Sequence, residues 1–143
     1  MSPLARVFVV KNTATVLLWA GPLVLAPPDL LAAVGLPRAA VPIARLLGWA
    51  YVALCVGCGA GFLEARAGRP ARAAAAVGLV SNAGAGACLA YVTATGGWAG
   101  WHLAAPGVAW ACVGLTLSIA GALYWFALRG GAGASSLCGI STL

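Results

Sequence analysis

The chain has 143 residues, of which 63% are hydrophobic and only 7% are charged, and its mean hydropathy is +1.01. Because soluble domains carry about 25% charged residues, this chain cannot cover itself with a hydrated surface. Its length suits one domain, with room for four membrane crossings of about 20 to 25 residues each. The composition therefore predicts an all-α integral membrane protein, a four-helix transmembrane bundle whose main partner is the lipid bilayer.

The formal net charge of +6 comes from eight Lys and Arg residues against two acids. In a soluble protein this balance would suggest a nucleic-acid or acidic-lipid partner. Here the basic residues cluster at the ends of apolar segments, which is typical of a membrane topology signal. We therefore expect no nucleic-acid partner.

The first span is predicted over about residues 5–26. Lys11 lies one or two turns from its start, so we expect its ammonium to reach the lipid headgroups by snorkelling. Gly21-Pro22 should kink the outer third. A short apolar segment, 30–36, follows between Asp29 and a proline; it is too short to cross and is expected to lie in the outer interface.

Three more spans follow, at about residues 43–63, 73–95 and 103–128. A four-span domain would thus occupy residues 1–129. Residues 130–143 have the small, flexible composition of a disordered tail.

The distribution of Lys and Arg predicts the orientation, because these residues are preferentially retained on the cytoplasmic side. Placing both termini in the cytoplasm leaves only Arg38 and Arg45 outside. The residues then placed inside are Arg6, Lys11, Arg66, Arg69, Arg72 and Arg129.

Small residues recur at about four-residue intervals in the last three spans, and such stripes let helix backbones approach closely in lipid. A compact bundle is the prediction, although a genome rich in G and C would also raise the Gly and Ala content. The stripes are Ala53, Gly57 and Gly61; Ala83, Gly84, Gly86, Ala87 and Ala90; and Gly114, Ser118 and Ala122.

Cys55 and Cys58 form a C-x-x-C sequence, which can be a redox pair or half of a zinc site. In a helix the two thiols would share one face. Their predicted position near mid-membrane, without a cysteine in an outer loop, favours ordinary packing of small apolar residues. No three- or four-ligand metal site is predicted.

His102, the only histidine, is predicted at the outer end of the fourth span beside Trp101. Such an imidazole could ligate a haem or a pigment, or hydrogen-bond a quinone. The competing interpretation places it simply among the headgroups. No cofactor is therefore predicted, and these two residues are candidate cofactor contacts only.

Three polar residues are further candidates. Arg45, in the first turn of the second span, must snorkel or find a partner, and Asp29 is the only acid predicted on its side. Asn82, which follows Ser81, should hydrogen-bond another helix, line a polar cavity or contact a substrate. No acid is predicted at the bilayer centre, which argues against an ion-coupled transporter.

The arrangement of these segments resembles that of the DoxX-like superfamily and its DUF4345-type relatives, which are small bacterial four-helix membrane proteins. The resemblance rests on the short outer segment 28–36, on 44–48 (Ala-Arg-Leu-Leu-Gly), on the basic inner loop and on Ser81-Asn82. It implies a bacterial inner-membrane protein with a partner-dependent role near quinone or redox chemistry. It transfers no catalytic residue.

Three functions follow as hypotheses. The first is a non-catalytic accessory or structural subunit that packs its small-residue faces against copies of itself or other membrane subunits. The second is a membrane redox protein that acts on quinones or thiols through Cys55 and Cys58. The third is a small transporter or channel for a neutral or lipid-like molecule.

Overall fold

The computed structural model describes residues 1–99, 101 and 103–129, and this part of the chain contains helices and no strand. Four helical stretches within it are long and apolar enough to cross a membrane. Their limits lie close to those expected from the sequence, and the prediction of four apolar helices is confirmed. The stretches are Pro3–Leu25, Arg38–Arg66, Arg72–Ala94 and Ala105–Ala127.

The first stretch is built from α1 (Pro3–Thr15), the π-helical turn η1 (Val16–Ala20) and α2 (Gly21–Leu25). The side chain of Ser2 caps the start of α1 by accepting a hydrogen bond from the backbone N–H of Ala5. The π turn comes directly before the Gly21-Pro22 pair. Because Pro22 has no N–H to donate to the preceding turn, the irregular hydrogen bonding expected at a proline is absorbed in η1.

The short segment between the first two spans folds as α3 (Pro28–Ala33), followed by the 3-10 turn η2 (Arg38–Ala40). Residues 30–33 of the short apolar segment expected between the first two spans are thus helical. Gly35, between them, has a φ of +106°, a conformation that L side chains rarely adopt. This turn brings the chain back to the start of the next helix.

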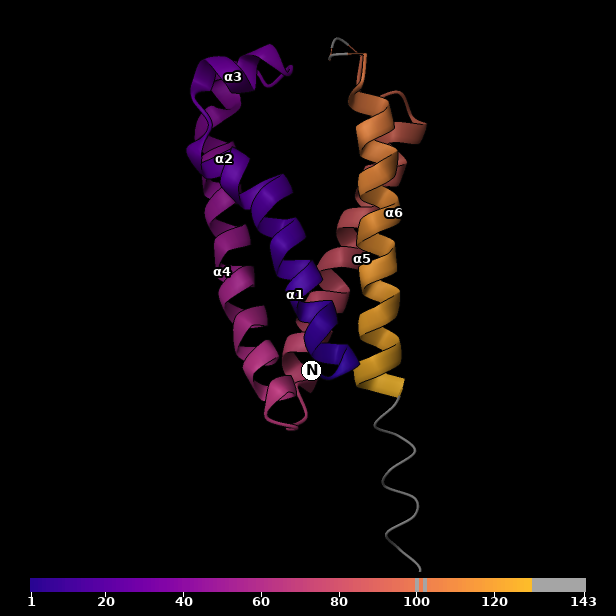
Figure 1. The fold of residues 1–143 in the computed structure, drawn as a ribbon. Helices are drawn as coiled ribbons and strands as arrows, with labels where there is room; N and C mark the ends of the chain where they lie inside the picture. The colour runs from indigo at the N-terminus through magenta and orange to yellow at the C-terminus, as the bar shows by residue number, and fades with distance from the viewer. Residues whose placement is uncertain (100, 102, 130–143) are drawn as a thin grey trace, which may run out of the picture.

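The remaining helices are α4 (Val41–Arg66), α5 (Arg72–Ala94) and α6 (Ala105–Leu123), and α6 continues into the π-helical η3 (Tyr124–Arg129). Figure 1 shows that α1, α2 and α3 accompany α4, whereas α5 and α6 lie side by side as a second group. The two groups converge toward the N-terminus and diverge toward α3. The molecule is therefore closed at one end and splayed at the other.

The core lies at the convergent end. Phe8 and Leu123 are fully buried there, together with Cys58, Ala75 and other small residues. Gly61 lets Phe8 and Ala74 approach its backbone, and a Cβ there would overlap both. Small side chains thus bring the two groups together at this end, as expected for helices that pack in lipid.

The predicted small-residue stripes are only partly used in this packing. Gly61 and Gly86 are buried against neighbouring helices, whereas Gly57, Gly84 and Gly114 are exposed and have open space where a Cβ would lie. The fourth-span stripe lies on the open face of α6. Spacing alone predicted that these residues share a face, and the direction of that face depends on how the helices are rotated.

Candidate ligand-binding cavity

One face of the first helical stretch carries Lys11, Thr15, Leu18 and Trp19. These residues are spaced by four, seven and eight positions, so the helix places their side chains in one line. The line points into the space between the two helix groups. It forms the first wall of a small polar chamber.

Lys11 is only 2% exposed, and the prediction that it snorkels to the headgroups is wrong. Its aliphatic stem lies over Gly78 of α5, where a Cβ would come within 3.4 Å of Lys11 Cε. The glycine therefore leaves room for the lysine to cross into the interior. A helix rotation that buries this face outweighs the tendency of a lysine to extend outward.

The opposite wall of the chamber carries polar side chains among apolar ones such as Leu54 and Leu115. Asn82 and Ser81 come from α5, Thr116 comes from α6 and Tyr51 comes from α4. The chamber is partly open and has about 30 Å³ of free space. Since one water molecule needs roughly 10–15 Å³ by this measure, the chamber holds about two waters or one small polar group.

Hydrogen bonds within single helices hold these polar side chains in place. Thr15 donates to the Lys11 carbonyl at 2.8 Å, Thr116 to the Cys112 carbonyl at 2.8 Å, and the Asn82 amide to the Gly78 carbonyl at 2.7 Å. Asn82 therefore lines a polar cavity, and its hydrogen bond stays within α5 instead of joining two helices. Each hydroxyl oxygen keeps acceptor capacity for a group in the chamber.

No hydrogen bond or ion pair of the Lys11 ammonium occurs within residues 1–99, 101 and 103–129. The sequence has only two acids. Asp29 pairs with Arg38 at an exposed position, and Glu64 lies in the last turn of α4; neither lines the chamber. A buried cation thus faces a polar chamber that contains no acidic side chain.

A second, larger cavity of about 510 Å³ lies between the helix groups toward α3. Its size falls in the range of about 300–1,000 Å³ that is typical of small-molecule sites. Its lining is almost entirely apolar or aromatic and comes from α2, α3, α5 and α6 as well as η1. Representative lining residues are Pro22, Leu31, Leu89, Trp98, Val108 and Ala109.

Two tryptophans that follow α5 contribute to the α3 end of this cavity. Trp98 and Trp101 meet edge to face, with ring centroids 5.2 Å apart, and the Trp98 indole donates to Thr93 Oγ1 at 2.9 Å. Trp101 also lies against Gly35, where a Cβ would come within 2.9 Å of the indole ring. The positive-φ glycine thus brings the α3 segment onto the tryptophan pair across the splayed end.

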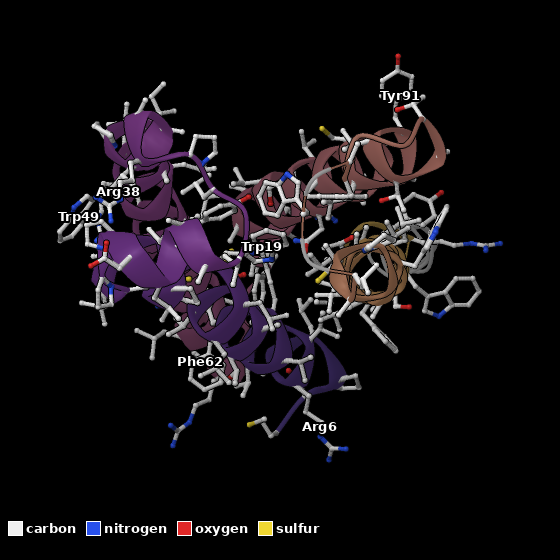
Figure 2. The ribbon with its side chains drawn as sticks, turned by 90° about the horizontal axis from the view of Figure 1, so that it is seen from above. Arg6, Trp19, Arg38, Trp49, Phe62 and Tyr91 are labelled. Atoms are coloured by element: carbon white, nitrogen blue, oxygen red, sulfur yellow. The ribbon has the colours of Figure 1, made fainter. Side chains whose placement is uncertain are left out.

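The two cavities adjoin, because both are lined by Leu18, Trp19 and Cys112. The Trp19 ring stacks on Tyr51, with centroids 6.0 Å apart. Figure 2, which looks down the molecule, shows Trp19 between the two helix groups, while Arg6, Arg38 and Tyr91 point outward. A polar chamber and an apolar cavity therefore form one composite site.

The expected Asp29–Arg45 pair does not form. Asp29 binds Arg38 at 2.6 Å, while Arg45 donates to the backbone carbonyls of Leu23, at 2.8 Å, and Ala26. Arg45 thus caps the carboxyl end of α2, where unpaired carbonyls and the helix dipole favour a cation. Arg38 is the nearer partner for Asp29 because the turn after α3 brings them together.

Cys55 and Cys58 are both free thiols. Cys58 is buried in the core beside Phe8, and the backbone carbonyl of Cys55 accepts a hydrogen bond from the Asn12 amide at 3.2 Å. Neither thiol lines the composite site. In the described part of the chain, no group of three His, Cys, Asp or Glu side chains could hold a metal ion.

His102 and the tail, 130–143, lie outside the described residues. Trp101, predicted beside His102 as a cofactor contact, lines the apolar cavity. The structure thus brings Trp101 and Asn82 to one composite site and leaves Asp29, Arg45 and the C-x-x-C pair away from it.

Lys11, Thr15, Thr116 and Cys112 were not expected to share a site. One signal was present in the sequence, since Lys11 and Thr15 are four residues apart within an apolar span and must share a helical face. No comparable sequence signal indicated that Cys112 and Thr116 of α6 would line the same chamber. It depends on how that helix packs against α5.

A scan against protein-family models and searches of the curated proteins and of the solved structures find no match for this chain. The composite site is therefore the principal basis for its function.

Proposed function

We propose that this chain is a multi-pass membrane protein that binds a lipid-like molecule inside its helix bundle. The observation that carries the proposal is the cavity of about 510 Å³, which is apolar along most of its lining and shares Leu18, Trp19 and Cys112 with an adjoining chamber that carries polar groups. Such a combination suits a molecule with a long apolar part and one small polar end. It supports the lipid-like ligand of the third hypothesis drawn from the sequence and does not by itself imply transport.

The placement of arginines supports an orientation with both termini in the cytoplasm. The start of α1, the loop from α4 to α5 and the end of η3 lie at the convergent end of the molecule, and the positive-inside rule assigns an arginine-rich end to the cytoplasm. These segments carry Arg6, Arg66, Arg69, Arg72 and Arg129. The apolar cavity would then lie in the outer half of the bilayer.

The resemblance to DoxX-like proteins, with the bacterial inner membrane that it implies, stays a prediction. It is compatible with a lipid-like ligand and with a quinone. The size of the polar chamber favours a lipid-like ligand over a quinone. Its volume of about 30 Å³ is enough for about two waters and is too small for a quinone ring.

Filling the cavity tests the proposal. Ala109 is 5% exposed and lines the cavity, so Ala109→Phe should place an aromatic ring where the ligand binds. We expect the wild-type protein, purified in dodecyl maltoside, to retain a lipid-like molecule that mass spectrometry detects after solvent extraction. The variant should retain at least about tenfold less, as expected when a site is sterically blocked.

Ala111→Phe is the matched control, because Ala111 is exposed and lies on another face of α6. It adds the same ring without entering the cavity and should keep the wild-type ligand content. Equal ligand content in the wild type and Ala109→Phe, with both proteins monodisperse, would contradict the proposal.

A second candidate function is the accessory subunit predicted from the small residues. Gly107, Gly114 and Gly121 recur every seven residues on α6, and each has open space where a Cβ would lie. A seven-residue glycine period keeps one face of a helix small along its length. That face could receive a helix from another copy or from a larger complex.

Gly114→Leu should reduce such association without altering the interior of the bundle. We expect chemical cross-linking in native membranes to yield fewer oligomers or complexes for this variant than for the wild type. Gly57→Leu, at an exposed glycine of α4, is the control for added hydrophobic surface. The subunit hypothesis fails if the wild type itself yields only uncross-linked monomer.

A further inference from the structure

We infer that the polar chamber binds the carboxylate of a long-chain monocarboxylic acid, with Lys11 as its counter-ion and the acyl chain in the apolar cavity. The inference rests on the binding function proposed above and names its ligand class. Its basis is the juxtaposition of three features: the Lys11 side chain, which is 2% exposed and makes no hydrogen bond or ion pair within the described residues, a narrow chamber, and an adjoining apolar cavity.

Lys11 needs an anionic partner. An ammonium buried within a membrane-spanning bundle is costly, and such groups pair with an anion or mark a ligand pathway. Lys11 lies about 12 Å along the helix from Pro3, at about 1.5 Å per residue, too deep to meet the headgroups from a side chain that points inward. Both acids of the chain lie away from the chamber. Within the described residues, the titratable neighbour of Lys11 is the Cys55 thiol, and no carboxylate lines the chamber. We therefore expect the anion to come from another molecule.

The chamber's size and lining select the kind of anion. About 30 Å³ of free space suits a carboxylate, whose two oxygens replace about two waters. The Asn82 amide has two N–H groups and uses one of them on the Gly78 carbonyl, so the other can donate to a carboxylate. The hydroxyls of Thr15 and Thr116 donate to carbonyls of their own helices and would have to turn away from them to donate to the head. A phosphate ester with a bulky headgroup would not fit in this volume.

The position of the apolar cavity accounts for the acyl chain. It begins at Leu18 and Trp19, next to the chamber, and reaches Leu23 within α2. From Lys11 to Leu23 the helix rises about 18 Å at about 1.5 Å per residue, and the chains of one lipid leaflet span about 15 Å. One extended chain therefore matches the route from the chamber to the tryptophan pair.

The test compares a labelled acid with the alcohol of the same chain length. Wild-type protein in dodecyl maltoside is titrated with tritiated palmitate and tritiated hexadecanol in a scintillation proximity assay. Palmitate should bind at least about tenfold more tightly than hexadecanol, the preference expected from one charge-assisted pair. Hexadecyl phosphate, which has a larger head, should bind more weakly than palmitate.

Lys11→Met removes the charge and keeps an unbranched apolar side chain. It should lose the preference for palmitate and still bind hexadecanol as the wild type does, which also shows that the variant is folded. Arg6→Met removes one charge from an exposed position of the same helix and should keep the preference.

The outcomes separate the two proposals. If the wild type binds neither palmitate nor hexadecanol, the lipid-like binding function itself fails. If it binds both equally well, or if Lys11→Met keeps the acid preference, binding stands and the carboxylate assignment is overturned. Tighter binding of hexadecyl phosphate than of palmitate would also overturn the carboxylate as the preferred head.

Discussion

Arg45 is the residue whose role differs most from a simple electrostatic expectation. Arg38 and Arg45 both follow Asp29 in the sequence, and only Arg38 forms an ion pair with it. The guanidinium of Arg45 instead donates to the backbone carbonyls of Leu23 and Ala26. It joins the second span to the end of the first. This position makes it a structural residue of the fold, outside the composite site.

Replacing Arg45 by Met should therefore lower stability. Two carbonyls at a helix end would lose a charged donor, a loss of about 1–3 kcal/mol by comparison with other charge-assisted hydrogen bonds. We expect a lower midpoint in a thermal assay that follows the monodisperse fraction by size-exclusion chromatography in detergent.

Arg38→Met is the control for that prediction. It removes the same charge, but its ion pair with Asp29 is exposed on both sides, and such pairs contribute little to stability. A larger loss for Arg38→Met than for Arg45→Met would contradict the capping role of Arg45.

At the residue scale, the sequence predicted which polar side chains needed a partner, and it did not predict the partners. Asn82 was expected to line a cavity as one alternative, and it does. Lys11 was placed with the headgroups because a lysine near a span end can usually extend outward. The glycine at position 78, which gives its stem a path inward, lies on another helix, and local sequence carries no information about that contact.

At the scale of elements, α5 and α6 depend on glycines that have no room for a side chain. A Cβ at Gly86 would lie 2.7 Å from Leu117 Cδ2 and 2.9 Å from Thr116 Oγ1, both on α6. Gly84, two residues earlier, has nothing within 4 Å. Gly84 and Gly86 therefore allow the effect of an added side chain to be compared at an open and a packed position of the same helix.

Gly86→Val should force α5 and α6 apart, with a loss of about 1–3 kcal/mol as is usual for overpacked positions. Gly84→Val carries the same change in helix propensity and should leave the thermal midpoint close to that of the wild type. The same chromatographic assay measures both. Equal midpoints for the two variants would contradict the packing of Gly86 against α6.

Helix existence and approximate limits were predictable, because long apolar runs bounded by charges and prolines leave few alternatives. The irregular elements, such as the π turn, were less predictable. The kink predicted at Gly21-Pro22 corresponds to a π turn over Val16–Ala20. The sequence marked the proline, while the way in which the backbone accommodates it depends on packing against α4.

At the scale of the whole molecule, the orientation can be tested with single cysteines in a cysteine-free background. Ala39, in η2, and Ala67, after α4, are both exposed and lie in connections on opposite sides of the second span. A membrane-impermeant maleimide added to intact cells should label Ala39→Cys and leave Ala67→Cys unlabelled.

Cell lysis is the control, because both cysteines should then react. The reverse pattern in intact cells would place the termini outside and would require the arginine-rich end to be translocated, against the usual retention of positive charge. Labelling of both sites in intact cells would contradict a second span that crosses the bilayer.

By itself, the sequence determined that the chain forms four long apolar helices, since their number follows from local hydrophobicity and from charges at segment ends. Only the tertiary structure decided that the two helix groups diverge, that Lys11 faces inward, and that residues from all four long helical stretches and from α3 surround one composite site. The physical reason is that helices in an apolar chain differ little in hydrophobicity around their circumference. Their rotation is therefore set by close contacts such as those at Gly61, Gly78 and Gly86, and those contacts join segments far apart in the sequence.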